Sequence, residues 1–206
     1  MTLTDPASPS PCSRGEYPDR VRLPLGFDAA RMAQDVERLE PVGWTPHFVT
    51  QNYDGDWSVI PLRAPAGARH PILMIYPDPM ATVFEDAPWL ARAPYLRAVL
   101  GAFGCPLQGA RLMRLAPGAS ILEHRDHDLT LAEGKARLHI PIQTNPDARF
   151  RLNGTAVTMA PGEVWYLRLS DPHEAANAGD RERVHLVIDV LANAWLEALV
   201  ERALTA

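Results

Sequence analysis

Lysine, cysteine and long apolar runs are the scarcest features of this chain of 206 residues. Lys135 is its single lysine, and the other 19 of the 20 basic residues are arginine. Two cysteines, Cys12 and Cys105, are too few for a disulfide framework or a Cys-x-x-Cys metal site. The chain shows neither the pattern of a secretory leader nor an apolar run that could cross a bilayer. We therefore expect a cytoplasmic protein that does not contact membranes.

An excess of positive charge is also missing. The formal net charge is −5, which disfavours nucleic acid as a partner. Apolar residues make up 47% of the chain and charged residues 22%, the balance of a globular domain that can bury a core. Proline, in contrast, is abundant: 20 prolines favour short strands and structured loops over long helices. This composition leaves a small molecule or a peptide as the expected partner.

The chain predicts one domain preceded by a tail. Residues 1–20 are dominated by proline and serine and show no periodicity, so we expect a mobile tail there. Residues 21–206 form the expected domain, in which 21–107 mix helices and strands. Short strands follow one another over 108–191, and 192–206 contain a closing helix. Sequence repeats and signs of a second domain are missing.

The first half of the domain predicts three main elements besides a strand that starts at Trp57. Residues 27–40 carry an apolar stripe at helical spacing, and Asp28 can cap that helix. The short apolar run 71–76 is typical of a buried strand. Residues 87–104 predict helical structure that Pro94 kinks or splits.

From residue 108 onward the sequence pattern is typical of a β domain. Turn residues such as Asn-Pro-Asp, Asn-Gly and Pro-Gly separate short runs that predict strands. These runs cover 109–115, 120–126, 136–144, 148–152, 155–159, 163–169 and 182–191. The expected fold class is therefore mainly β with flanking helices, in the form of a sandwich or small barrel.

Two of these strands carry charged and apolar residues on opposite faces. Side chains alternate across a strand, so residues i and i+2 point the same way. In the run 137–142, Leu138, Ile140 and Ile142 share one face; in the run 183–188, Val184, Leu186 and Ile188 share one face, and Val187 lies on the other face with the polar residues. The polar face carries Arg137, His139, Arg183 and His185. Such a face either meets water or lines the inside of a barrel that holds a charged ligand.

A candidate metal site begins with the His-x-Asp pair of His124 and Asp126. Both side chains can reach one point if the segment is extended. His173, in a turn-rich segment after Pro172, is the best third ligand. Two imidazoles and one carboxylate form the facial triad that holds Fe(II) and leaves positions open for substrate and dioxygen. The same ligands also accept Zn²⁺ or Ni²⁺, so the metal stays open at this point.

Arg183 suggests what else the site binds. A guanidinium buried without an anionic partner is costly, and the sequence offers no fixed carboxylate on its face of the strand. A dicarboxylic co-substrate would supply that partner through two parallel charge-assisted hydrogen bonds.

Taken together, these segments resemble the aspartyl/asparaginyl β-hydroxylase family of Fe(II)- and 2-oxoglutarate-dependent dioxygenases. They are also similar to the bacterial proline cis-hydroxylases of the same superfamily. The resemblance is carried by His-Arg-Asp at 124–126, by 134–145, by Pro-Gly-Glu-Val-Trp-Tyr-Leu at 161–167 and by 172–190. It covers the second half of the chain, whereas the first half matches only loosely.

The resemblance implies a double-stranded β-helix, or cupin-like jelly roll, in which His124, Asp126 and His173 hold the iron. It implies that Arg183 pairs with the far carboxylate of 2-oxoglutarate, and that Arg137 and His139 lie around the other end of this co-substrate. Asp126 makes the chain more like the bacterial members, because the animal enzymes lack the carboxylate of the triad. Where the family places a serine against the co-substrate, this chain has Met113.

Other polar and aromatic residues have simpler interpretations. Trp57 and Arg63 are candidates for shaping the substrate pocket and for gripping a substrate carboxylate, although packing also explains a tryptophan after a turn. For the remaining histidines we expect ordinary surface or strand positions: His47, His70, His127 and His185.

The predicted activity is hydroxylation of an amino acid, an amino-acid derivative or a peptidyl Asp/Asn-type side chain. Its cofactor would be Fe(II), and its co-substrates 2-oxoglutarate and dioxygen. The alternative is a cupin-like barrel that binds a metal or small molecule without turnover. Arg183 separates the two, because a simple metal site needs no distant cation.

Overall fold

The computed structural model describes residues 17–76 and 78–205. Most of the tail expected over residues 1–20, including Cys12, lies outside the described residues, and residue 20 already belongs to the first strand. The helices are α1 (Ala29–Leu39), α2 (Pro71–Ile75), α3 (Pro94–Gly101) and α4 (Ala194–Thr205). Short 3-10 helices are η1 (Glu40–Val42), η2 (Thr50–Asn52), η3 (Pro88–Arg92) and η4 (Leu131–Glu133). None of the helices described is long and apolar enough to span a membrane.

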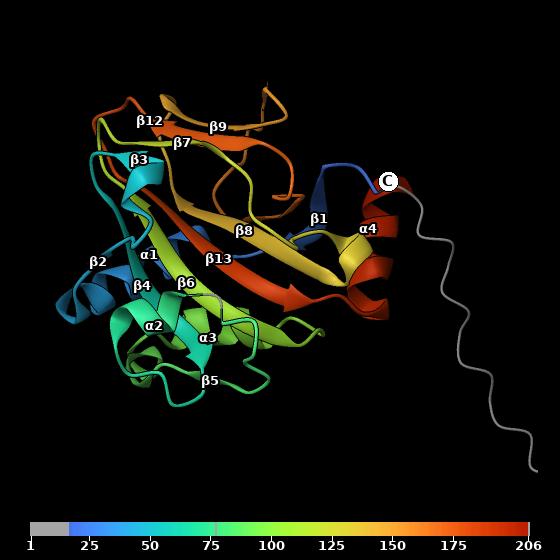
Figure 1. The fold of residues 1–206 in the computed structure, drawn as a ribbon, viewed down its shortest axis with the longest axis horizontal. Coiled ribbons are helices and arrows are strands. Elements are labelled where there is room, and N and C mark those ends of the chain that lie inside the picture. The colour runs from blue at the N-terminus through green and yellow to red at the C-terminus, as the bar shows by residue number, and fades with distance from the viewer. Residues whose placement is uncertain (1–16, 77, 206) are drawn as a thin grey trace, which may run out of the picture.

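Two antiparallel sheets form the body of the molecule (Figure 1). The larger sheet has the order β1-β11-β8-β13-β6-β4-β2, with β5 paired to β4. Its strands are β1 (Arg20–Gly26), β2 (Thr45–Pro46), β4 (Trp57–Pro65), β5 (Phe84–Asp86), β6 (Leu107–Leu115), β8 (Lys135–Gln143), β11 (Glu163–Leu167) and β13 (Arg183–Leu191). The smaller sheet has the order β10-β9-β12-β7-β3. Its strands are β3 (Tyr53–Asp54), β7 (Ser120–His124), β9 (Ala148–Leu152), β10 (Thr155–Ala156) and β12 (His173–Asn177).

The core divides into two apolar layers because the strands alternate their side chains. On one face of the larger sheet, the aliphatic residues of β8 and β13 pack against α1 and α3; examples are Leu138, Ile140, Leu186 and Ile188. A second cluster lies between the two sheets and includes Leu115, Phe150 and Leu152. Burial of these side chains stabilises the fold by roughly 1.5–3 kcal/mol each.

The structure confirms most of the expected elements and corrects three. The run 71–76 is not a strand but the short helix α2, because Pro71 starts the helix and the His70 ring accepts a hydrogen bond from the Ile72 amide. The expected strand 155–159 shrinks to Thr155–Ala156. His173 lies in strand β12, between β7 and β9, rather than in a turn.

The first half of the chain contributes more to the sheets than its sequence indicated. β1 pairs with β11 and β4 pairs with β6, so both extend the larger sheet. Pro94 separates η3 from α3, as expected. Asp28 caps α1 by accepting a hydrogen bond from the Arg31 amide. The β core is therefore not confined to residues 108–191.

Asp35 links two helices and allows a test of the fold. Its carboxylate is fully buried and accepts hydrogen bonds from the backbone amides of Tyr95 and Leu96, at 2.7 and 2.9 Å, in the first turn of α3. Replacing Asp35 by alanine leaves two buried donors unpaired, so we expect a loss of about 3 kcal/mol in the free energy of unfolding. Urea denaturation followed by circular dichroism measures it. Asp35→Asn keeps an acceptor and should lose less; equal losses would contradict the capping role.

Candidate active site

The polar face predicted for β8 and β13 lines a cavity between the two sheets. Arg137 and His139 of β8, and Arg183 and His185 of β13, all contact this cavity. Their aliphatic neighbours belong to the core on the opposite face of the sheet. The structure therefore confirms the predicted alternation. The cavity has a volume of about 600 Å³, and its lining includes the exposed side chain of Tyr76, which follows α2.

The side chains of His124, Asp126 and His173 lie together in the lining of this cavity. His124 ends β7 and His173 begins β12, and the two residues are paired across these strands. Asp126 follows two residues after His124, and the bond from its amide to the carbonyl of Leu169, at 2.8 Å, holds it in place. Ligand-type atoms of the three side chains lie within 4.8 Å of one another. In the part of the chain that the structure describes, they form the one such cluster.

Both histidines of the cluster are oriented by backbone carbonyl groups. The Nδ1 atom of His124 lies 2.7 Å from the carbonyl oxygen of Leu122, and that of His173 lies 3.0 Å from the carbonyl oxygen of Asp171. A carbonyl oxygen can only accept, so each Nδ1 carries the proton and each Nε2 keeps a free lone pair. Burial lowers the pKa of His173 to about 4, which keeps its ring neutral. Two neutral imidazoles with free Nε2 atoms and a carboxylate are a donor set that fits Fe(II).

A buried ionic network supports the carboxylate of the cluster. Asp126 accepts a hydrogen bond from Arg137, and the Arg137 Nε donates to Asp189 at 2.5 Å. Arg111 donates to the other oxygen of Asp189 at 2.8 Å. Burial opposes ionisation of Asp126, but the positive charge of Arg137 and of other neighbours outweighs it and lowers the pKa. The network keeps Asp126 anionic and fixes its orientation.

Arg183 lies at another part of the cavity without a carboxylate partner. Its side chain is buried, and no ion pair to it occurs among the residues described. Its contacts are His185 Nδ1, 3.3 Å from Nη2, and the ring of Phe150, 6.0 Å from its central carbon. Burial lowers the pKa of Arg183 to about 10, so the group remains charged at neutral pH. An isolated buried cation of this kind fits an anionic ligand.

His139 is another buried polar group in the cavity, and it has no hydrogen-bond partner among the described residues. It is 7% exposed, and neither ring nitrogen has a partner in the described structure. Burial, and then the charge of Arg183, hold its pKa well below the ordinary value, so the ring is neutral. Unpaired buried polar atoms cost free energy, and a bound ligand would remove that cost.

The two residues predicted to contact substrate have different positions. Trp57 lines the cavity, whereas Arg63 does not. The guanidinium of Arg63 instead pairs with Asp86 at 2.7 Å and donates to the carbonyl oxygens of Phe84 and Leu107 at 2.9 and 3.1 Å. Its donors hold β4, β5 and β6 together, so Arg63 is left out of the substrate site proposed below.

Sequence analysis missed His47, which also lines the cavity. Its ring stacks on that of Trp57, with centroids 3.7 Å apart and an interplanar angle of 12°. Burial lowers its pKa to about 3, so the ring is neutral. No periodic pattern surrounds His47, and its proximity to the cavity arises only when β2 pairs with β4.

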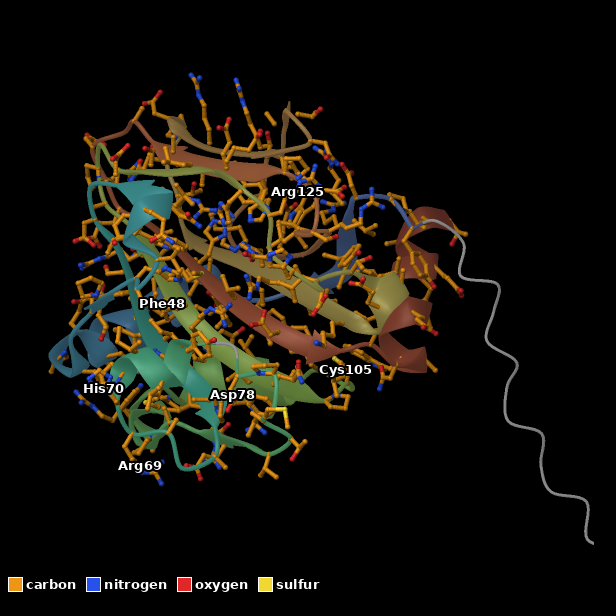
Figure 2. All side chains as sticks on the ribbon, in the orientation of Figure 1. Phe48, Arg69, His70, Asp78, Cys105 and Arg125 are labelled. Atoms are coloured by element: carbon orange, nitrogen blue, oxygen red, sulfur yellow. The ribbon has the colours of Figure 1, made fainter. Side chains whose placement is uncertain are left out.

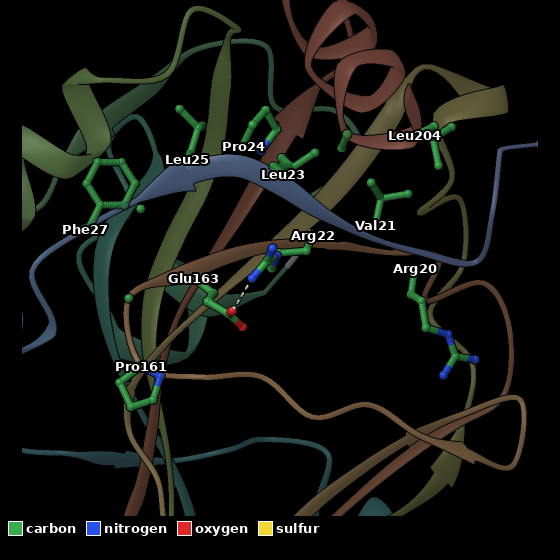
Figure 3. A pocket seen from close by; sticks show the side chains of 13 residues that line it. Arg20, Val21, Arg22, Leu23, Pro24, Leu25, Phe27, Pro161, Glu163 and Leu204 are labelled. Carbon is green, nitrogen blue, oxygen red and sulfur yellow. Dashed lines mark hydrogen bonds and ion pairs between the residues drawn. The ribbon is translucent and has the colours of Figure 1, made fainter. Parts of the chain in front are cut away.

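A second hollow, of about 820 Å³, lies beside edge strand β1 and the end of α4 (Figure 3). Its lining contains the ion pair between Arg22 and Glu163, at 2.9 Å, and mainly backbone and aliphatic surface elsewhere. The metal-type cluster and the unpaired Arg183 both line the first cavity instead. The first cavity is therefore the candidate active site.

Comparison with known proteins agrees with the geometry. The model of the aspartyl/asparaginyl β-hydroxylase family matches residues 28–193, and the chain belongs to this family. The match includes all three residues of the metal-type cluster as well as Arg183.

Curated relatives lie among bacterial amino-acid hydroxylases. The chain is 29% identical to L-proline cis-4-hydroxylase of Rhizobium meliloti (strain 1021), over 84% of this chain and 61% of that protein. It is 27% identical to L-proline cis-3-hydroxylase 1 of a Streptomyces species, over 81% of this chain and 58% of that protein. The chain thus spans about three fifths of the length of the curated relatives it matches.

A solved structure from Burkholderia pseudomallei, described as an oxidoreductase of the 2OG-Fe(II) oxygenase family, superposes with a TM-score of 0.56. The superposition covers 84% of this chain and 85% of that one, at 18% identity. It shows a shared fold, the double-stranded β-helix, which confirms the fold class expected from the sequence.

Proposed function

We propose that this protein is an Fe(II)- and 2-oxoglutarate-dependent dioxygenase that hydroxylates an amino acid, an amino-acid derivative or a peptidyl Asp/Asn-type side chain. One observation carries the proposal: a cluster of two histidines and a carboxylate shares a cavity with a buried, unpaired arginine. The names of the curated relatives support the amino-acid class of substrate. A cytoplasmic location belongs to the same proposal, and the free thiol of Cys105 is consistent with it.

In this proposal the protein supplies position and a water-poor cavity. His124, Asp126 and His173 would hold the metal, with each histidine ring kept in the Nδ1–H form by a backbone carbonyl. Arg183 would bind the far carboxylate of 2-oxoglutarate. Iron and 2-oxoglutarate, when bound, supply the activation of dioxygen for hydroxylation of a C–H bond.

Two further residues of the proposal act around the metal. His139 lines the cavity, and its two ring nitrogens have no partner among the described residues; the nitrogen that carries the proton would donate to the keto-acid end of 2-oxoglutarate. Arg137 was expected to contact the same end. Its bonds to Asp126 and Asp189 support a role in orienting the metal-binding carboxylate, with any contact to the co-substrate made by its remaining donor capacity.

A cupin-like barrel that binds metal without turnover is the rival proposal. It needs the three ligands but gives no reason for a buried cation elsewhere in the cavity. The position of Arg183 therefore favours the oxygenase.

Succinate release tests the proposed function. Purified protein with Fe(II), 2-oxoglutarate and air should form succinate, and one class within a panel of amino acids, N-acyl amino acids and short peptides should stimulate it. Mass spectrometry of the stimulating compound should show an added oxygen atom. A protein that binds Fe(II) but neither binds 2-oxoglutarate nor forms succinate with any member of the panel would support the rival barrel.

A further inference from the structure

Four aromatic rings form a continuous row along the wall of the cavity. Trp57 stacks on His47 at 3.7 Å between centroids, His47 on Phe48 at 4.8 Å, and Phe48 meets Tyr76 at 5.7 Å. We call these four residues the aromatic ladder. Trp57 is buried, whereas Tyr76 is 48% exposed, so the ladder runs from the interior to the mouth of the cavity. All four rings line the cavity. Phe48 is labelled in Figure 2.

The inner part of the ladder lines the same cavity as the metal-type cluster. Burial lowers the pKa of His47 most, and the positive charges of Arg111 and Arg137 lower it further. The apolar side chains of Met74, Ile75 and Phe84 line the same cavity. The ladder therefore forms an apolar arm of the same cavity that holds the candidate active site.

The cavity is also larger than a small amino acid requires. At about 20 Å³ per close-packed non-hydrogen atom, 2-oxoglutarate and proline together fill roughly 360 Å³, whereas the cavity measures about 600 Å³. Exposed aromatic faces at a cavity mouth are typical of apolar recognition, because burying them against a ligand removes apolar surface from water.

Building on the proposed function, we propose that the substrate is an amino acid or amino-acid derivative with an aromatic or long apolar group, and that this group lies along the aromatic ladder. The neutral ring of His47 suits this assignment, since a charged ring would favour an anionic group instead. Free proline would fill only the inner part of the cavity.

Calorimetric titration under anaerobic conditions tests the assignment with protein loaded with Fe(II) and 2-oxoglutarate. The ligands are L-proline, L-leucine and the N-phenylacetyl derivative of each. We expect at least one N-phenylacetyl derivative to bind about tenfold more tightly than its parent, because the added ring buries apolar surface and stacks on the ladder. Phe48→Ala should remove this gain, whereas the control Leu73→Ala, in the exposed part of α2, should keep it.

Three results would overturn the assignment. The parent amino acids could bind as tightly as their derivatives, or the derivatives could fail to bind. In the third case, Phe48→Ala would weaken the binding of both ligand types equally. Failure of the proposed function looks different, because the protein would then bind no 2-oxoglutarate in the presence of Fe(II).

A second inference concerns His185, which the sequence placed as an ordinary strand histidine. Its ring is 2% exposed, lines the cavity, and receives a hydrogen bond at Nδ1 from Arg183. A guanidinium can only donate, so His185 must carry its proton on Nε2. No described protein atom bonds to this Nε2, nor is it among the buried atoms left without a partner, so it reaches the open cavity.

We infer that His185 donates a second hydrogen bond, through Nε2–H, to the same carboxylate that Arg183 binds. The residue paired with His185 in the neighbouring strand is Met113, which has no hydrogen-bond donor to offer. A buried carboxylate has several lone pairs to satisfy, and one guanidinium leaves part of them free. This inference also depends on the proposed co-substrate.

Anaerobic titration of the Fe(II)-loaded protein with 2-oxoglutarate and with 2-oxopentanoate, which lacks the far carboxylate, isolates this bond. His185→Leu should weaken 2-oxoglutarate binding about tenfold and leave 2-oxopentanoate unchanged. His185→Gln offers an amide donor and should restore most of the affinity. The control Leu191→Ala, at the exposed end of the same strand and outside the cavity lining, should change the binding of neither ligand. Equal binding of 2-oxoglutarate by His185→Leu, or equal weakening of both acids, would overturn the inference. If the unmodified protein binds neither acid, the proposed function itself fails.

Discussion

Replacing His173 by alanine is expected to abolish substrate-dependent succinate formation, with a fall of at least about 1000-fold in kcat/KM. His173 supplies one of three candidate metal ligands, and its ring is buried beside the cavity. A site reduced to one imidazole and one carboxylate loses most of its affinity for a divalent metal. Metal analysis after gel filtration should therefore show that the variant no longer retains Fe(II), independently of activity.

The control for this change is His127→Ala, which removes an exposed histidine at the rim of the same cavity. It should retain iron and activity, because His127 does not belong to the ligand cluster. Circular dichroism should show that both variants keep their strand content, since β12 is held by backbone pairing with β7 and β9. Normal iron retention and turnover in His173→Ala would remove His173 from the metal site.

Replacing Arg183 by leucine should raise the Kd for 2-oxoglutarate about 100-fold, because a buried charge-assisted pair is lost. The same change should leave Fe(II) binding intact, since Arg183 is not among the clustered ligand groups. Folding should survive as well, because the arginine is buried without a carboxylate partner among the described residues, and a shorter apolar side chain removes the cost of burying that charge. Anaerobic titration calorimetry measures the Kd for 2-oxoglutarate, and urea denaturation measures the free energy of unfolding.

Binding of 2-oxopentanoate provides the internal control for the Arg183→Leu prediction. This acid can chelate a metal but has no far carboxylate for Arg183, so its Kd should be nearly the same in the unmodified protein and in the variant. Unchanged 2-oxoglutarate binding by Arg183→Leu would instead favour the cupin-like barrel without turnover, because the buried cation would then have no role in holding a diacid.

Local patterns in the sequence correctly predicted much of what surrounds the site. Period-two alternation in β8 and β13 separated the core residues from those that line the cavity, since a strand presents successive side chains to opposite faces. The His-x-Asp pair and the candidate third histidine also lie together as the sequence suggested. Their roles as iron ligands remain predictions that the variants above test.

Features that depend on distant partners could not be found in the same way. Nothing in the sequence linked Asp35 of α1 to the first turn of α3, or showed that the donors of Arg63 are used by neighbouring strands. His47 joins the cavity only because its segment folds back beside Trp57. The helical form of α2, in contrast, has a local cause that the apolar run concealed: Pro71 begins the helix and the ring of the preceding His70 caps it.

The sequence alone therefore determined the mainly β fold class and the two-faced strands, and it singled out the residues proposed to bind a metal and an anion. These follow from local periodicity and side-chain chemistry, which act over a few neighbouring positions. Tertiary structure decided which charges neutralise one another: it gave Arg137 two carboxylates, whereas Arg183 has none among the residues that the structure describes. It also aligned four aromatic rings from three separate segments. Such pairings depend on strand order and register, which bring together residues far apart in the chain.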